Sequence, residues 1–238
     1  MQYQHLTIVF NGEIYNYAEI EKELQAEGHV FKGHSDTEMI LHAYSVWGIE
    51  CIQKFIGMFA FALYDEQKQQ LFCVRDRAGV KPFFYYFKDN VFLFGSELKS
   101  MLAHPAFQKE INKDAAASFM QLGYVPTPHC IWQHTYKIKP GHFLIFSIKD
   151  GTYKTTQYWN VYDGYNKPKL KIGFEEAKKE TEKLLQSACE YRMVADVPVG
   201  VFLSGGYDST TVTALLQKDR TEKIKTFTIG VPDAGLNE

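Results

Sequence analysis

The pattern of hydrophobic and polar positions divides the chain into a long strand-rich part and a shorter part in which helices and strands alternate. In the first part, short apolar or aromatic runs separated by turn residues are typical of strands. They predict strands at residues 5–10, 58–64, 71–75, 83–87, 91–94, 137–148 and 152–159. The run 58–64 is apolar at every position, which predicts a central strand that is covered on both faces. The first strand runs into Asn11-Gly12, which is a tight-turn signal.

Apolar residues at helical spacing, together with capping residues, predict the helices of the first part. One helix covers residues 18–26 and stops at Gly28. The next begins after Ser35-Asp36 and ends at Gly48, and Ser35 with Glu38 has the spacing of a capping box. Two further helices are predicted at residues 98–103 and 114–122.

Beyond residue 159 the pattern changes. Residues 160–171 show no sustained periodicity and are interpreted as a linker between two domains. A strongly helical segment at 174–188 follows, and then a strand, a turn, a helix and a strand at residues 199–203, 204–209, 210–217 and 225–230. Strand, loop, helix and strand in this order are typical of a parallel α/β unit.

Composition narrows the class of protein. The 238 residues are 45% hydrophobic and 23% charged, which is ordinary for a globular protein. A formal net charge of −2 shows no basic excess, so we expect no nucleic-acid partner. No apolar run has the length of a membrane span and no signal-peptide pattern is present, so we expect a cytoplasmic protein with no membrane association. The four cysteines are scattered and the histidines lack metal-binding spacing, so we expect reduced thiols and no zinc site.

The segment Ser204-Gly-Gly-Tyr-Asp-Ser209 lies between a predicted strand and a predicted helix. Two glycines permit close approach of the backbone, and successive N–H groups at a helix start favour an anion. Ser204 and Ser209 add hydroxyl donors, and Asp208 could cap the helix or help to organise a metal bound to phosphate. A bare Ser-Gly-Gly would more often be a capped glycine turn. The complete segment resembles the SGGxDS pyrophosphate loop of the ATP pyrophosphatases, which form acyl-adenylates from ATP.

Six phrases of the chain resemble those of class II glutamine amidotransferase domains. They are Asn11-Gly-Glu-Ile-Tyr-Asn16, His34-Ser-Asp-Thr-Glu38, Gly57-Met-Phe-Ala-Phe-Ala-Leu-Tyr-Asp65, Arg75-Asp-Arg-Ala-Gly-Val-Lys-Pro82, Ser96-Glu-Leu-Lys99 and Tyr158-Trp159. In this order, ahead of the pyrophosphate loop, they resemble the glutamine-dependent asparagine synthetases over nearly the entire chain.

The resemblance implies a fold class and a domain organisation. The first domain would be an α+β sandwich of the N-terminal-nucleophile αββα type, here incomplete. The start of an α/β Rossmann-like ATP-pyrophosphatase domain would follow it. The implied boundaries are residues 1–159 for the glutamine amidotransferase type 2 domain, 160–171 for the linker and 172–238 for the start of the second domain.

The resemblance also implies a site for glutamine. Hydrolysis of its side-chain amide passes through an oxyanion, which needs hydrogen-bond donors held in place in advance. By resemblance these are the side chain of Asn11 and the backbone N–H of Gly12, while Glu13 and Asp36 match residues that hold the α-amino group. A hairpin turn at Asn11-Gly12 and a helix cap at Asp36 are the structural alternatives, and each can coexist with function. The charged residues Arg75, Asp76, Arg77 and Lys81 are interpreted as a structural turn between strands, and the aromatic residues of 83–94 as core.

For the second domain the resemblance implies binding of ATP with Mg²⁺; metal ligands are not identified. The matching ATP-binding positions are Leu203, Ser204, Gly205, Gly206, Asp208, Ser209 and Ile229. The implied activity is asparagine synthesis. Glutamine hydrolysis supplies ammonia to a β-aspartyl-adenylate formed from aspartate and ATP, giving asparagine, AMP, pyrophosphate and glutamate. The oligomeric state is left open, with a homodimer as one option.

Amidotransferases of this class use an N-terminal cysteine as nucleophile. Here Met1 is followed by Gln2, and no cysteine lies near the start. We therefore expect a chain that is truncated at both ends and inactive when alone. Two alternatives stay open: a relative that amidates another carboxylate or closes a β-lactam ring, and a non-catalytic binding module or inactive fragment.

Overall fold

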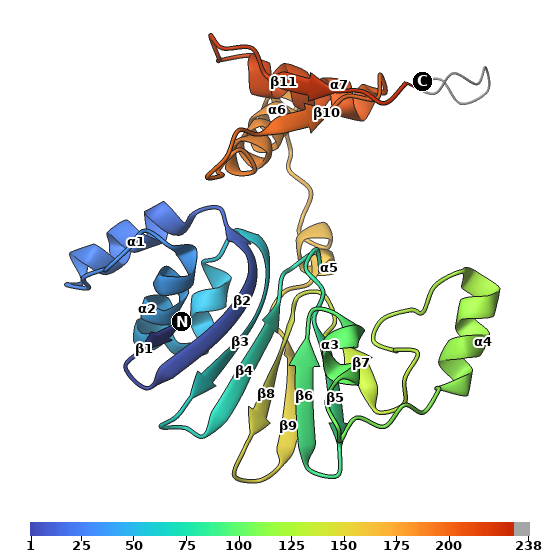
Figure 1. Ribbon diagram of the computed structural model, residues 1–238. Coiled ribbons are helices and arrows are strands. Elements are labelled where there is room, and N and C mark those ends of the chain that lie inside the picture. The colour runs from blue at the N-terminus through green and yellow to red at the C-terminus, as the bar shows by residue number, and fades with distance from the viewer. Residues whose placement is uncertain (231–238) are drawn as a thin grey trace. The chain divides into compact units, whose positions relative to one another are not determined.

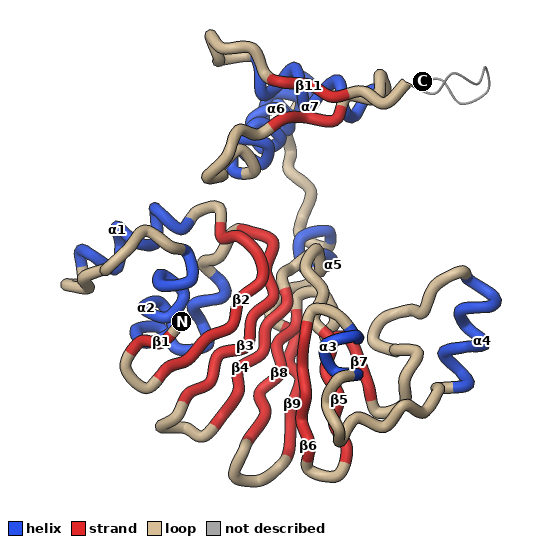
Figure 2. The backbone as a smooth tube through the Cα atoms, in the orientation of Figure 1, coloured by secondary structure: helices blue, strands red, loops and turns tan. Residues whose placement is uncertain are grey.

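The computed structural model describes residues 1–230. The chain divides into two compact units, Met1–Lys167 and Pro168–Glu238. Figure 1 labels the helices and strands of both units, and Figure 2 distinguishes helix, strand and loop along the backbone.

A six-stranded antiparallel sheet forms the centre of the first unit, with strand order β1-β2-β3-β4-β8-β9 (Figure 1). Its strands are β1 Gln2–Tyr3, β2 Leu6–Ile14, β3 Gly57–Asp65, β4 Gln70–Arg75, β8 His142–Ser147 and β9 Thr152–Gln157. β3 lies between β2 and β4, and its residues 59–63 are all buried. The prediction of a central strand covered on both faces is therefore confirmed.

Helices cover one face of this sheet. They are α1 Tyr17–Ala26 and α2 Asp36–Trp47, followed by the short 3₁₀ helix η1 Gly48–Gln53. Ile40 of α2 belongs to the same buried cluster as Phe61 and Leu63 of β3. Alternate residues of β3 point to opposite faces, so Ala60 and Ala62 are left for the other side.

A second antiparallel sheet packs on that other side, with strand order β6-β5-β7. Its strands are β5 Phe84–Lys88, β6 Val91–Gly95 and β7 Thr135–Lys137. Ala60 and Ala62 are buried together with Tyr85 of β5. On the outer face of the second sheet, Tyr86 packs with Met101 of α3 Leu98–Leu102. The helix α4 Lys113–Leu122 completes this part of the unit.

The layers of the first unit are thus helix, sheet, sheet, helix, which confirms the predicted αββα class. The aromatic residues of 83–94 are largely core, as predicted, with Phe83 and Tyr85 buried and Phe92 and Phe94 packed against them.

Three local predictions differ from the structure. Asn11 and Gly12 do not form a turn: they lie inside β2, paired with Ala60 and Phe59 of β3. The single strand predicted at 137–148 is interrupted at Pro140-Gly141, because Gly141 has φ +66° and redirects the chain between β7 and β8. The predicted linker contains a helix, α5 Val161–Tyr165, capped by Asn160.

The second unit contains α6 Phe174–Tyr191, β10 Gly200–Phe202, α7 Tyr207–Gln217 and β11 Lys225–Phe227. β10 and β11 are parallel, with Gly200 opposite Lys225. The expected α/β unit with a parallel strand pair is therefore confirmed.

Candidate functional site

The interior of β2 brings together the residues of the candidate glutamine site. Asn11 and Glu13 are two positions apart, so their side chains lie on one face of the strand. This is the face that carries Ala60, the register partner of Asn11, and therefore the face toward the second sheet. There the Nδ2 of Asn11 donates a hydrogen bond of 3.0 Å to the Oγ of Ser96, which follows β6.

Only glycine fits at position 12, between Asn11 and Glu13. A Cβ at Gly12 would lie 2.2 Å from the carbonyl oxygen of Met58 and 2.6 Å from the Cα of Phe59. The φ of Gly12 is +150°, a value that residues with a side chain rarely adopt. The close approach of β2 to β3 at this point therefore depends on the missing side chain.

The ladder between β2 and β3 sets the direction of the Gly12 N–H group. The register partner of Gly12 is Phe59, whose own N–H and C=O bond Asp76 on the far side of β3. In an antiparallel pair, partners that do not bond each other direct their N–H and C=O groups outward on both sides. The Gly12 N–H therefore points to the outer edge of β2. Within the described residues, backbone pairing along that edge extends only as far as Ile8.

Asp36 lies at the same edge. It is the first residue of α2, and its Oδ2 accepts a hydrogen bond of 3.1 Å from the N–H of Ile14. Ile14 is two positions beyond Gly12 on the strand, so both N–H groups point outward together. The structure thus gathers Asn11, Gly12 and Asp36 around the end of β2.

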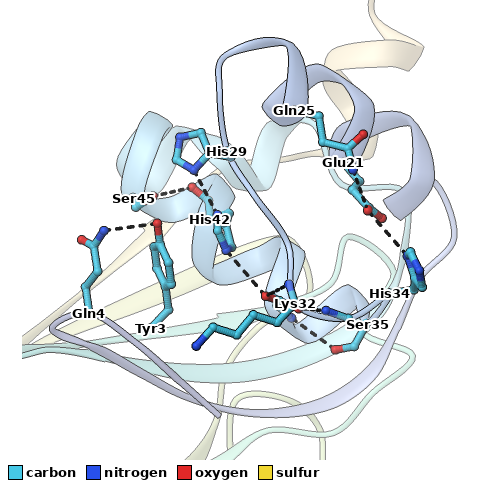
Figure 3. Close-up of polar contacts among 12 residues, drawn as sticks. Tyr3, Gln4, Glu21, Gln25, His29, Lys32, His34, Ser35, His42 and Ser45 are labelled. Carbon is cyan, nitrogen blue, oxygen red and sulfur yellow. Dashed lines mark hydrogen bonds and ion pairs between the residues drawn. The ribbon is translucent and has the colours of Figure 1, made fainter.

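The start of α2 is held by two different contacts (Figure 3). The Ser35 Oγ accepts a hydrogen bond from the N–H of Glu38, as the predicted capping box requires. The Glu38 carboxylate does not return the bond to Ser35. It accepts instead from the N–H groups of Lys32 and Gly33, at 2.8 and 2.9 Å. These bonds fix the loop that leads into Ser35 and Asp36.

The buried side chain of His42 lies next to the Glu38 carboxylate (Figure 3). His42 is 1% exposed, its Nε2 lies 3.9 Å from the Glu38 Oε1, and its Nδ1 lies 3.0 Å from the Nδ1 of His29. The rings of Tyr3 and Phe31 pack against it. Burial and the neighbouring His29 lower the pKa of His42, and Glu38 opposes them. The net effect on His42 therefore favours its neutral form.

The pKa of Glu38 is also lowered. Burial works to raise it, but the N–H groups of Lys32 and Gly33, together with His42, outweigh that effect. The carboxylate is thus kept ionised and bonded to the loop.

The charged turn after β4 has a structural role, as predicted. The Arg75 guanidinium donates to the carbonyl oxygens of Lys81, Gly79 and Ile138. Asp76 is 1% exposed, and its carboxylate accepts from the N–H groups of Phe59, Val80 and Lys81. The Arg77 guanidinium donates to the carbonyl oxygens of Phe55 and Gln53.

The cysteines of the first unit are not placed for nucleophilic chemistry. Cys51, Cys73 and Cys130 are buried, and burial raises the pKa of each thiol above its ordinary value. A nucleophilic cysteine needs the opposite shift, toward the thiolate. Free, buried cysteines agree with the prediction of reduced thiols.

In the second unit, the segment 204–209 consists of a short loop and the first turn of α7, so the helix begins three residues earlier than predicted. The Ser209 Oγ accepts from the N–H of Ser204 at 3.3 Å and donates to the carbonyl of Gly206 at 3.2 Å. Gly205 has φ +84°, which favours glycine, and α7 begins directly after Gly206. The first N–H groups of that helix face out of the loop, where an anion can bind them.

A pocket of about 200 Å³ adjoins this loop. Leu203, Ser204 and Ile229 contribute to its lining, and the Leu203 N–H bonds the carbonyl of Phe227 at 2.9 Å. The structure therefore places the ends of β10 and β11 beside the loop. Residues 1–230 contain no group of three or more His, Cys, Asp or Glu side chains able to hold a metal.

Ser96 is the residue that reasoning from the sequence missed. It belongs to a recognised phrase, Ser96-Glu-Leu-Lys99, but 85 positions separate it from Asn11 and no local pattern connects the two.

None of the helices in the described residues is both long and apolar enough to cross a membrane.

Comparison with known proteins gives matches over both units. Residues 1–159 match the family model described as glutamine amidotransferase domain, and residues 180–238 match that of asparagine synthase. A putative asparagine synthetase (glutamine-hydrolysing) of Methanocaldococcus jannaschii is 42% identical over 94% of the chain and 43% of its own length. Asparagine synthetase (glutamine-hydrolysing) 3 of Bacillus subtilis is 41% identical over 94% of the chain and 36% of its own length.

The chain thus spans less than half the length of these relatives. Among solved structures, a glutamine phosphoribosylpyrophosphate amidotransferase of B. subtilis aligns with 94% of the chain and 45% of its own, at 17% identity and a TM-score of 0.45. The family assignment rests on the match over residues 1–159.

Proposed function

The chain belongs to the glutamine amidotransferase domain family, and from that membership we propose that it is part of a glutamine-dependent asparagine synthetase. The observation that carries the proposal is the arrangement at the end of β2: the Asn11 side chain lies on the face toward the second sheet, while the outward N–H of Gly12 and the Asp36 carboxylate lie at the adjoining outer edge. The presence of the loop 204–209 in the same chain supports an ATP-dependent second step.

In the first step, glutamine would be hydrolysed to glutamate and ammonia. The Asn11 carboxamide and the Gly12 N–H would donate hydrogen bonds to the oxyanion that forms on the reacting amide. Asp36 would bind the α-ammonium group of glutamine, with Glu13 as the second carboxylate. Loss of one oxyanion donor typically costs about 10²–10³ in rate.

In the second step, ATP and aspartate would give a β-aspartyl-adenylate and pyrophosphate, and ammonia would then displace AMP to give asparagine. Ser204, Gly205, Gly206 and Ser209 would bind phosphate through their N–H and hydroxyl groups, while Leu203 and Ile229 would flank the adenosine. Mg²⁺ commonly binds through one or two carboxylates plus substrate phosphates. Asp208 is the loop carboxylate that would hold it, and the ion would neutralise phosphate charge.

The proposal extends to organisation and surroundings. It assigns residues 1–159 to the amidotransferase domain, 160–171 to the linker and 172–238 to the start of the ATP-pyrophosphatase domain. Glutamine, aspartate and ATP are the proposed substrates, in a cytoplasmic enzyme that could assemble as a homodimer.

The test is AMP formation by the complete gene product, with aspartate compared against other carboxylates. We expect AMP and asparagine only when aspartate is present, with either glutamine or ammonia as nitrogen source. Activity with another carboxylate and none with aspartate would reject asparagine synthesis while keeping the ligase class. Asn11→Ala should slow the glutamine-dependent reaction by about 10²–10³ and leave the ammonia-dependent one intact.

A further inference from the structure

Ser96 connects the candidate oxyanion site to the second sheet. Asn11 lies in β2 of the six-stranded sheet, whereas Ser96 directly follows β6 of the three-stranded sheet. The 3.0 Å hydrogen bond from the Asn11 Nδ2 to the Ser96 Oγ therefore spans the two sheets. The proposed reaction uses Asn11 and leaves Ser96 without a role.

The turn that carries Ser96 is itself held in place. The Ser100 Oγ donates to the carbonyl of Glu97 at 2.7 Å, which closes the turn into α3. Gly95 packs directly against that hydroxyl, since a Cβ at Gly95 would lie 2.5 Å from the Ser100 Oγ. The Ser96 hydroxyl is thus a fixed partner for Asn11 rather than a mobile surface group.

An asparagine carboxamide needs such a partner to keep one orientation. The torsion that turns its plane has broad minima, so an unpaired carboxamide samples many angles. Its nitrogen carries two N–H donors. The bond to Ser96 engages one of them and leaves the second for a ligand.

The rest of the surroundings offers Asn11 little else to bond. A pocket of about 120 Å³ adjoins both residues, and its other side chains are apolar, among them Phe83 and Phe94. Among the described residues that line this pocket, Ser96 is therefore the polar side chain that distinguishes one orientation of the Asn11 carboxamide from the others.

We propose that Ser96 is a positioning residue for glutamine hydrolysis: its hydroxyl fixes the Asn11 carboxamide so that one N–H stays available to the oxyanion. The inference rests on the proposed function, because it concerns the rate of that reaction. It predicts that Ser96 acts on the chemical step and not on the affinity for glutamine, since its hydroxyl is engaged with Asn11.

The kinetic test compares Ser96→Ala, Ser96→Thr and a matched control, Ser118→Ala, in the complete gene product. Ser118 bonds only the carbonyl of Asp114 on exposed α4. Ser96→Ala should lower kcat for glutamine hydrolysis by about 3- to 10-fold, the worth of one hydrogen bond, with little change in KM. Ser96→Thr retains the hydroxyl and should restore most of kcat, and Ser118→Ala should have no effect.

A second test uses the NMR signals of the Asn11 side-chain amide in the 238-residue chain labelled with ¹⁵N-asparagine. Asn11→Asp identifies these signals by their disappearance. Ser96→Ala should shift them and speed their exchange with water, whereas Ser96→Thr and Ser118→Ala should leave them near their original positions. Because this test needs no activity, it reports on the hydrogen bond by itself.

The outcomes separate the two proposals. Unchanged Asn11 signals in Ser96→Ala overturn the positioning role, as does an equal loss in kcat and thermal stability that threonine does not restore. Normal hydrolysis by Ser96→Ala also overturns it while leaving the proposed function standing. If the unsubstituted protein does not hydrolyse glutamine at all, the proposed function fails, and the catalytic role of Ser96 fails with it even where the NMR shift shows the bond.

Discussion

The two units of the chain differ in how their functional segments are fixed. In the first unit the contacts are long-range: Ile14 bonds Asp36 over 22 positions, and Asn11 bonds Ser96 over 85. In the second unit the Ser204 and Ser209 contacts span only five positions. The candidate glutamine site therefore exists only when the sandwich is folded, whereas the phosphate loop is largely organised by its own sequence.

The first unit also buries more hydrophobic side chains than the described part of the second unit. Leu63 and Ile40 of the first unit are 0% exposed, in a core between helices and sheet. In the described part of the second unit, Leu216 is the one buried hydrophobic residue, while Phe174 and Leu184 of α6 are 80% and 68% exposed. A two-stranded sheet with two helices has little apolar surface to bury, so the second unit should be the less stable of the two.

The largest expected effect comes from adding one methyl group to a glycine. Gly12→Ala places a Cβ 2.2 Å from the Met58 carbonyl oxygen at a φ of +150°, so β2 must move off β3. We expect a loss of at least about 4 kcal/mol in the free energy of unfolding of the first unit. Gly205→Ala is the matched change in the second unit, where no atom lies within 4 Å and only the φ of +84° is strained. It should cost about 1 kcal/mol.

Tryptophan fluorescence during urea unfolding measures the first of these changes, because Trp47, Trp132 and Trp159 all lie in the first unit. Hydrogen exchange of α7 amides measures the second. Equal costs at both glycines would show that backbone strain, rather than the close approach of β3, accounts for Gly12.

A second pair of substitutions compares the two cores directly. Leu63→Ala removes a side chain that is 0% exposed, and a cavity at such a site costs about 2–5 kcal/mol. Leu184→Ala removes one that is 68% exposed and should change stability by less than about 0.5 kcal/mol. Urea midpoints for the first, and exchange rates of α6 amides for the second, provide the measurements. A large cost at Leu184 would mean that its side chain is covered in solution.

The same contrast explains what the sequence could predict. The central strand β3 and the helix α2 are visible in local patterns, namely an uninterrupted apolar run and a capped helical repeat. The loop 204–209 is also local. The prediction of a turn at Asn11-Gly12 was wrong, because the dipeptide signal is local. It contains no information on β3, the strand more than 40 positions away with which these residues pair. The role of Ser96 depends on the packing of two sheets, which no window of sequence contains.

A third, smaller effect separates a structural carboxylate from a functional one. Asp76→Asn replaces a buried group that accepts three backbone N–H bonds by one that can present only a single, uncharged oxygen to them. We expect a loss of about 1–3 kcal/mol in the stability of the first unit. Asp208 is exposed in the first turn of α7, so Asp208→Asn should leave the stability of the second unit unchanged and weaken Mg-ATP binding. Urea unfolding and calorimetric titration with Mg-ATP distinguish the two, and an unstable Asp208→Asn would assign that residue to the fold.

The smallest effect is a dependence of stability on pH that belongs to the first unit, since all eight histidines lie there. Burial and His29 lower the pKa of His42 in the folded state, whereas the unfolded chain should titrate near the ordinary value of about 6.5. Between these two values the unfolded state binds more protons, so the free energy of unfolding falls as the pH falls below about 6.5 and stops falling below the folded-state pKa. His42→Gln should remove this part of the acid-side loss, and His129→Gln, at an exposed position, should not. Urea midpoints followed by tryptophan fluorescence between pH 7.5 and 5 measure the difference; parallel curves for the unsubstituted chain and His42→Gln would exclude His42 as its source.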